Sequence, residues 1–244
     1  MSLLLLGAGA SPPLRNAVVF DGTNDYMQRG ADLTGNADGK KGLVSVWFRL
    51  NGGNDAAQRI FATEGGIFYF DRAASNKITV VGYTAAIVQV LGLTSTASYT
   101  AGSSLIHLLA AWDLATATGQ MYVNGADDLA GGSTLTNLDI DYTRTDHAFG
   151  SSNGGSSKCN MDIAEAYVNL AETLDISNAA NRAKFRTASG TSANLGTDGS
   201  TPTGIAPIVY FKHAPGAAAT DFATNRGGGG NFTITGTLTE ANGA

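Results

Sequence analysis

Short runs of β-branched, aromatic and aliphatic residues recur along the chain, and glycine, asparagine, aspartate and serine separate them. This spacing predicts a dozen strands arranged as two packed sheets. The expected strands are 17–20, 42–50, 59–63, 67–71, 77–82, 86–93, 105–113, 120–123, 148–150, 161–170, 207–212 and 231–238. The predicted fold class is therefore all-β, a two-sheet antiparallel β-sandwich with one short helix.

The alternation within a strand indicates which side faces the core. In 42–50, the side chains of Val44, Val46, Phe48 and Leu50 share one face, which we expect to be buried. The stretch 105–112 is apolar on both faces, so we place it centrally in its sheet. A tight turn should follow 120–123 at residues 124–125, where the sequence is Asn-Gly.

The single helix is expected at 178–187, where the Ser177 hydroxyl can accept a hydrogen bond from a free amide of the first turn. Beyond it, residues 189–204 are rich in Gly, Ser and Thr, and 214–230 end in four glycines. We therefore divide the chain into an N-terminal arm at 1–16 and a sandwich at 17–188. The rest, 189–244, is interpreted as a linker, a return strand and a Gly-rich tail that packs on the sandwich.

Charged residues make up only 14% of the chain, the net charge is −5 and the pI is about 5.0. This acidic balance, without any run of Lys or Arg, argues against nucleic-acid binding. A surface built from Gly, Ser, Thr, Asn and Ala is common in secreted and particle-bound β-proteins. The single cysteine, Cys159, excludes an internal disulfide and a cysteine zinc cluster, and we expect a lone, semi-buried thiol.

The chain begins with a run of four leucines: Leu3, Leu4, Leu5 and Leu6. The run lacks a basic flank and is shorter than the roughly 7–15 apolar residues of a signal peptide. No stretch approaches the ~20 apolar residues that would span a bilayer, so no membrane span is expected. We therefore predict a retained N-terminus, which serves either as an edge strand or as a hydrophobic anchor on a partner.

Four stretches, in this order and spacing, resemble the laminin-G-like, concanavalin-A-like jelly rolls. Residues 18–26 (VVFDGTNDY) resemble the opening strand and its Asp-Gly turn, and 43–50 resemble the next long strand. Residues 107–113 with 120–125 resemble the central hairpin, and 149–155 with 162–168 resemble the closing strand. The resemblance covers 17–186 and implies a concanavalin-A-like jelly roll. Outside it, the four-leucine start and the run 225–227 before a Thr-rich strand look like bacteriophage structural proteins.

Members of this fold that cleave glycans carry the pattern Glu-x-Asp-x-x-Glu, in which two carboxylates act as nucleophile and acid. This chain has Asp162 and Glu165 but lacks the first Glu. On a regular strand, residues three apart face opposite sides. We therefore predict no enzyme activity and expect both carboxylates to bond to loops at the sheet edge.

Many relatives in this fold bind calcium through carboxylate and backbone oxygens at the rim of the sandwich. Asp21, Asn24 and Asp25 crowd one turn and are the candidate metal ligands; Asp127 and Asp128 crowd another. Both turns are equally well explained as Asx-turns, which use the same residues to satisfy the backbone. Calcium is left open, and no other cofactor is expected.

The histidines His107, His147 and His213 have no metal-ligand spacing, and we expect His107 to be a hydrogen-bonded histidine at a strand start. Sugar binding needs aromatic rings and amides at loop tips, because rings stack on pyranose faces and amides bond to hydroxyls. The candidates at or near predicted loops are Tyr26, Tyr83, Tyr99, Tyr142 and Asn153. The alternative is that these tyrosines are ordinary sheet-face residues.

Two functional hypotheses follow. The first is a non-catalytic structural or adhesion protein of a virus particle, a phage head decoration or tail-associated protein. It would be located in the virion, bind capsid or tail proteins, and form a homo-oligomer or multicopy assembly. The second is an extracellular carbohydrate-binding module that recognises glycans. A glycoside hydrolase is disfavoured by the incomplete carboxylate pattern.

Overall fold

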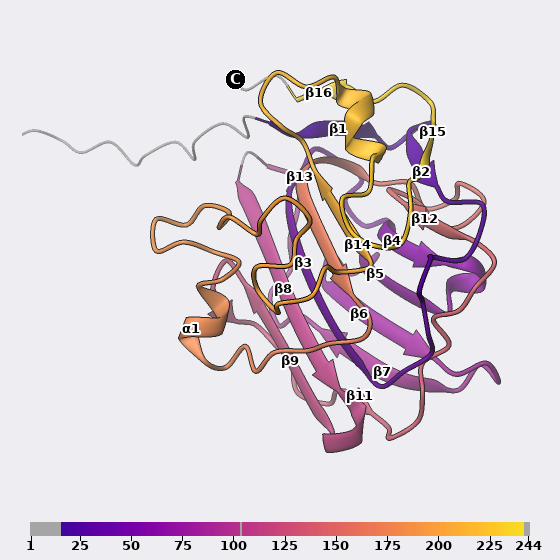
Figure 1. Cartoon of the computed structure of the whole chain (residues 1–244), viewed down its shortest axis with the longest axis vertical. Coiled ribbons are helices and arrows are strands. Elements are labelled where there is room, and N and C mark those ends of the chain that lie inside the picture. The colour runs from indigo at the N-terminus through magenta and orange to yellow at the C-terminus, as the bar shows by residue number, and fades with distance from the viewer. Residues whose placement is uncertain (1–15, 103, 242–244) are drawn as a thin grey trace, which may run out of the picture.

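The computed structural model describes residues 16–102 and 104–241, and in this part of the chain two antiparallel sheets face each other (Figure 1). The predicted all-β sandwich with one short helix is confirmed. The predicted partner anchor, Leu3 to Leu6, lies outside the described residues. None of the described helices is long and apolar enough to cross a membrane.

The first sheet, sheet A, has the order β10-β9-β8-β3-β13-β1-β16, and β14 also pairs with β13. Its strands are β1 (Val18–Asp21), β3 (Lys41–Leu50), β8 (Leu105–Asp113), β9 (Thr118–Val123), β10 (Ala126–Asp127), β13 (Asn160–Asn169), β14 (Val209–Lys212) and β16 (Thr239–Glu240). The position of β8 between β9 and β3 confirms the central placement expected from its apolar faces.

The second sheet, sheet B, has the order β11-β7-β6-β5-β4-β12-β2-β15. Its strands are β2 (Tyr26–Gln28), β4 (Gln58–Thr63), β5 (Phe68–Arg72), β6 (Ile78–Tyr83), β7 (Gln89–Thr94), β11 (Thr134–Leu135), β12 (His147–Phe149) and β15 (Thr233–Thr235). The 3-10 turns are η1 (Glu64–Gly66), η2 (Leu114–Thr116) and η3 (Ala219–Ala223).

The main core lies between the sheets. Val44, Val46, Phe48 and Leu50 are buried in it, which confirms the predicted inward face of β3. Asn124 and Gly125 both have positive φ, 54° and 85°, and join β9 to β10 in the tight turn that the sequence predicted.

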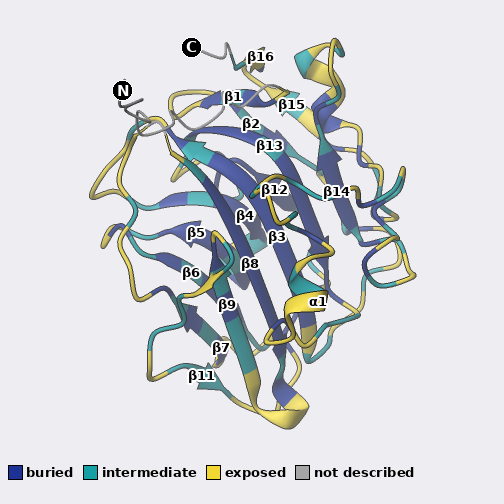
Figure 2. Ribbon diagram, turned by 90° about the vertical axis from the view of Figure 1, so that its left-hand side faces the viewer, coloured by how far each residue is buried: buried dark blue, intermediate teal, exposed yellow. Residues whose placement is uncertain are grey.

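A second core lies on the outer face of sheet A and was not predicted. Leu43 and Leu109, on adjacent strands, are buried there beneath Ile176, Phe185 and Leu195. These last three come from the long connection between β13 and β14, which carries the helix α1 (Ala179–Arg182). Figure 2 shows α1 outside the buried strands β3 and β8. Both faces of β3 are therefore buried. A strand with one face in the core and the other in solvent would have only every second residue buried.

Several predicted boundaries are wrong. The helix expected at 178–187 shrinks to α1, and its cap is Asn178, whose side chain accepts from Ala180 N at 2.9 Å, not Ser177. The strand expected at 86–93 begins at Gln89, because residues 84–88 form the turn between β6 and β7. The strand expected at 231–238 is interrupted, since Thr237 N donates to the Asp25 side chain and not to a neighbouring strand.

Candidate functional site

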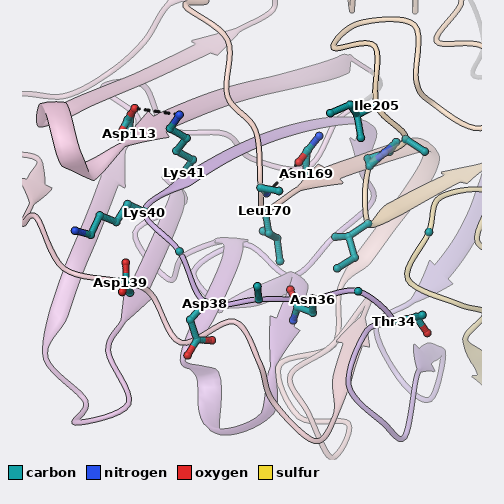
Figure 3. A pocket seen from close by; sticks show the side chains of 18 of the residues that line it. Thr34, Asn36, Asp38, Lys40, Lys41, Asp113, Asp139, Asn169, Leu170 and Ile205 are labelled. Carbon is teal, nitrogen blue, oxygen red and sulfur yellow. Dashed lines mark hydrogen bonds and ion pairs between the residues drawn. The ribbon is translucent and has the colours of Figure 1, made fainter.

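A cleft of about 670 Å³ lies at the end of the sandwich where β3 begins and β8 and β13 end. One wall is the segment 34–41, and the opposite wall is the segment 205–208 (Figure 3). Residues 169–171 lie between them, with Asp113, Ala115, Asp139 and Gly228 completing the lining. The two walls are about 170 residues apart in sequence, so only the fold brings them together.

Asn36, in the wall of the cleft, has a side chain that is held by two hydrogen bonds. Its Nδ2 donates to Asp32 Oδ1 at 3.0 Å and to Tyr142 O at 2.6 Å, which fixes the orientation of the carboxamide. The other carboxamide atom, Oδ1, is buried and has no hydrogen-bond partner among the described residues. The Asn36 carboxamide is therefore a fixed part of the cleft wall, with its oxygen closed off from solvent.

Charges of both signs surround this cleft. Lys41 forms an ion pair with Asp113 at 3.9 Å, and Asp38 Oδ1 accepts from Thr143 N and Oγ1 at 2.9 and 2.8 Å. Lys40 and the exposed Asp139 complete the charged lining. Aliphatic surface comes from Leu170, Ile205, Pro207 and Ile208. This combination suits a ligand that presents hydrogen-bonding groups beside an apolar face.

The candidate calcium turn is held by its own backbone. Asp21 Oδ1 accepts from the amides of Thr23, Asn24 and Asp25 at 2.7, 3.0 and 3.2 Å. Slight burial raises the pKa of Asp21, but these amides together hold it below its ordinary value. Asp25 is buried and accepts from Thr237 N at 2.7 Å. No group of three His, Cys, Asp or Glu side chains that could hold a metal occurs within residues 16–102 and 104–241. These hydrogen bonds are those expected of an Asx-turn, and calcium at this turn stays a prediction.

A buried guanidinium gathers oxygen atoms at another rim of the sandwich. Arg72 donates to the carbonyl of Gly53 and to Oδ1 of Asn54 and Asn76, the latter two at 3.0 and 2.9 Å. The carbonyls of Gly52, Ala56 and Tyr99 lie at 3.4 Å. Burial lowers the pKa of Arg72, with Asp55 and Asp71 acting in the opposite direction. One side chain thus joins three loops, as a hard cation would.

The five candidate sugar-binding residues do not form one site. Tyr142 lies in the segment before β12, but its ring is fully buried; its hydroxyl accepts from Trp112 Nε1 at 3.0 Å and donates to Lys41 O at 3.1 Å. The Tyr99 hydroxyl donates to Asp128 at 2.6 Å, and Tyr83 is half-buried on β6.

Tyr26 on β2, in contrast, lies against the loop after β12 that carries Asn153. Asn153 Nδ2 donates to Asp146 Oδ2 at 2.6 Å, and Gln28, two residues after Tyr26 on β2, donates to the same oxygen. The backbone of Gly155 packs against the Tyr26 ring. Sequence reasoning missed Gln28 and Asp146. If β2 had been predicted, the i, i+2 spacing of Tyr26 and Gln28 would have placed these two side chains on the same face of the strand.

The prediction that Asp162 and Glu165 face opposite sides is wrong. A β-bulge in β13 shifts its register against β3, so that Asp162 pairs with Arg49 and Glu165 with Trp47. Both carboxylates therefore lie on the outer face of sheet A. Each is buried and neutralised, Asp162 by Arg49 and Glu165 by Lys212 at 2.9 Å.

His107 and Cys159 are both fully buried. His107 Nε2 lies 2.9 Å from Ser45 Oγ, its Nδ1 has no partner, and its ring stacks on Trp47 with centroids 4.2 Å apart. Burial, helped by the charge of Arg186, lowers the pKa of His107 to about 3. Thus only one ring nitrogen is satisfied. Cys159 is completely buried, not semi-buried as expected, and burial raises its pKa.

Comparison with known proteins identifies the fold family. Residues 21–170 match the model of the concanavalin A-like lectin/glucanases superfamily. No curated protein sequence matches the chain. Among solved structures, it is similar to a proposed carbohydrate-binding protein from Bacteroides ovatus, with a TM-score of 0.63 and 15% identity over 94% of this chain and 61% of that one.

A second similar structure is the native heptameric SAP-like pentraxin from Limulus polyphemus, with a TM-score of 0.51 and 13% identity over 75% of this chain and 88% of that one. This chain spans only 61% of the length of the Bacteroides ovatus protein. At these identities the two structures show the fold alone. The family model covers more than half of the residues, so the chain belongs to the concanavalin A-like lectin/glucanase superfamily.

Proposed function

We propose that the protein binds carbohydrate without cleaving it, and that the cleft holds part of the saccharide. The observation that carries this proposal is the lining of the cleft, where Asp38, Lys40 and Asp139 lie in one concavity with aliphatic side chains. Sugar hydroxyls can bond to such charged groups, while the C–H faces of a sugar ring contact the aliphatic side chains.

The remaining lining supports the same ligand class. Its volume of about 670 Å³ falls in the range of roughly 300–1,000 Å³ typical of small-molecule sites. The carboxylates of the cleft can accept hydrogen bonds from sugar hydroxyls, and Lys40 can donate hydrogen bonds to these hydroxyls. The aliphatic side chains, Leu170 among them, suit the C–H faces of a sugar ring. The superfamily includes lectins, and the similar Bacteroides ovatus protein is itself a proposed carbohydrate binder.

Binding without hydrolysis is supported by the state of the two carboxylates on β13. A glycosidase needs one carboxyl group as nucleophile or base and the other as acid, both in reach of the substrate. Here Asp162 is paired with Arg49 and Glu165 with Lys212, and both are buried.

The test begins with a panel of neutral hexasaccharides, cellohexaose, maltohexaose and mannohexaose, together with acidic hexagalacturonate, titrated calorimetrically into the protein. Ala37→Trp places a large side chain at an exposed cleft position and should weaken binding at least tenfold. The matched control is Ala86→Trp, at an exposed position outside the cleft, which should bind as the wild type does. Unchanged affinity of Ala37→Trp would refute the cleft assignment.

The virion role predicted from the sequence finds no support in the similarities described above. A role as phage decoration or tail protein, capsid or tail partners, a multicopy assembly and a virion location all stay predictions. The extracellular location of the alternative hypothesis stays a prediction too.

A further inference from the structure

A second group of recognition side chains lies on the outer face of sheet B. We define the Tyr26 patch as Tyr26, Gln28, Asp146 and Asn153. Tyr26 and Gln28 are two residues apart on β2 and share a face, while Asp146 directly precedes β12 and Asn153 follows it in a loop. None of the four lines the cleft.

Asp146 fixes the orientation of both amides in the patch. Its Oδ1 accepts from the backbone amides of Gly30 and His147 at 2.8 and 2.7 Å. Its Oδ2 accepts from the side-chain nitrogens of Asn153 and Gln28. With both nitrogens turned to the carboxylate, the two amide oxygens point away from it. Neither oxygen receives a hydrogen bond from the described residues, and both side chains are partly exposed.

The aromatic ring beside these acceptors is backed by main chain. A Cβ at Gly155 would lie only 3.0 and 3.1 Å from Cε1 and Cζ of Tyr26, so a larger residue here would press on the ring, and the φ of 76° also favours glycine. The Lys158 ammonium donates to Gly155 O and lies 5.9 Å from the ring centroid. Tyr26 is thus held in place while part of its ring stays exposed.

We propose that the Tyr26 patch is a second saccharide-binding surface, specific for neutral sugars. A supported ring with two oriented acceptors is the combination that stacks on a pyranose and bonds to its hydroxyls. The carboxylate of Asp146 within the patch is balanced by the ammonium of Lys158 beside it, so the patch offers no preference for an anionic sugar. The proposal does not depend on the cleft.

The test uses the same hexasaccharide panel with Tyr26→Ala, Tyr26→Phe and the control Tyr83→Ala, each in the wild-type and the Ala37→Trp background. The Tyr26→Ala change should lower affinity for a neutral hexasaccharide at least tenfold in the Ala37→Trp background. Tyr26→Phe should restore binding because it keeps the ring, and Tyr83→Ala should leave it unchanged. Thermal melting of each variant checks that it is folded.

The outcomes separate the two sites. If Ala37→Trp removes all binding and Tyr26→Ala changes nothing, the second surface is refuted and the cleft proposal stands. If Tyr26→Ala alone removes binding while Ala37→Trp has no effect, the Tyr26 patch stands and the cleft assignment fails. A wild-type protein that binds no neutral member of the panel refutes the Tyr26 patch. Tighter binding of hexagalacturonate than of neutral sugars at this patch would overturn its proposed specificity.

Discussion

The outer faces of the two sheets are built to different rules. On sheet A, Tyr167 of β13 packs edge-on against Phe185, with ring centroids 5.3 Å apart, and the covering connection excludes water from the centre of the face. On sheet B, the guanidinium of Arg59 stacks 3.3 Å above the Tyr69 ring and pairs with Asp71. The outer face of sheet A is covered by a second core, whereas the outer face of sheet B carries polar pairs and, in the described part of the chain, no covering connection of this kind. A ligand can therefore contact sheet B.

Replacing the central covering side chain should produce the largest effect. Phe185→Ala removes a fully buried ring and should lower the free energy of unfolding by about 3–5 kcal/mol in urea denaturation. The counterpart on sheet B is Tyr69→Ala, which loses a half-buried ring and its cation–π contact with Arg59. That contact contributes ~1 kcal/mol to the free energy of unfolding. Equal losses for the two variants would contradict the contrast between a closed and an open face.

The closed face should also give the protein a specific sensitivity to acid. The pKa of His107 is lowered to about 3 by burial, against 6.5 in the unfolded chain. Below pH 6.5 the unfolded state binds a proton that the folded state excludes, so stability is full above pH 6.5 and falls toward pH 3. The slope from this residue is at most ~1.4 kcal/mol per pH unit.

Denaturation curves for wild type and His107→Gln between pH 7.5 and 4.5 give the free energy of unfolding of each protein. The difference between the two pH profiles is the contribution of His107. The variant should lose less stability on acidification than the wild type, because glutamine takes up no proton. Parallel pH profiles would show that the buried imidazole is not the cause.

The smallest expected effect lies at an edge of sheet B. Ile87 has φ of 60° and is 72% exposed at the turn between β6 and β7. A β-branched residue is disfavoured in this left-handed region, where glycine is not. Ile87→Gly should raise the free energy of unfolding by a few tenths to about 1 kcal/mol. A lower stability of the variant would mean that the exposed side chain makes a stabilising contact.

Strand alternation was sufficient to predict the main core but not the second one. The face Val44 to Leu50 follows directly from the period of two, and the apolar faces of 105–112 correctly indicated a central strand. The cover, however, consists of isolated apolar residues, Ile176, Phe185 and Leu195, which have no periodicity in a polar connection. Local sequence therefore gives no signal that they act together.

The candidate sites depend still more on long-range structure. The bulge that turns Asp162 and Glu165 to one face arises from pairing with β3 and leaves no mark in the spacing of the two residues. The cleft joins two loop segments without any motif. Tyr26 and Asn153 were chosen for their chemistry, but the Asp146 carboxylate that links Asn153 to Gln28 has four hydrogen bonds, with partners up to 118 positions away.

The guanidinium of Arg72 has a consequence for how the loops at its rim respond to their surroundings. Its positive charge belongs to a side chain of the protein. Unlike a bound metal ion, it cannot be removed from these loops by dilution, by a chelator or by exchange with another ion. Loops assembled around a dissociable ion would loosen when that ion is scarce. Here the loops that meet at Arg72 are joined by hydrogen bonds from a side chain of the same molecule, so these bonds do not require a dissociable ion.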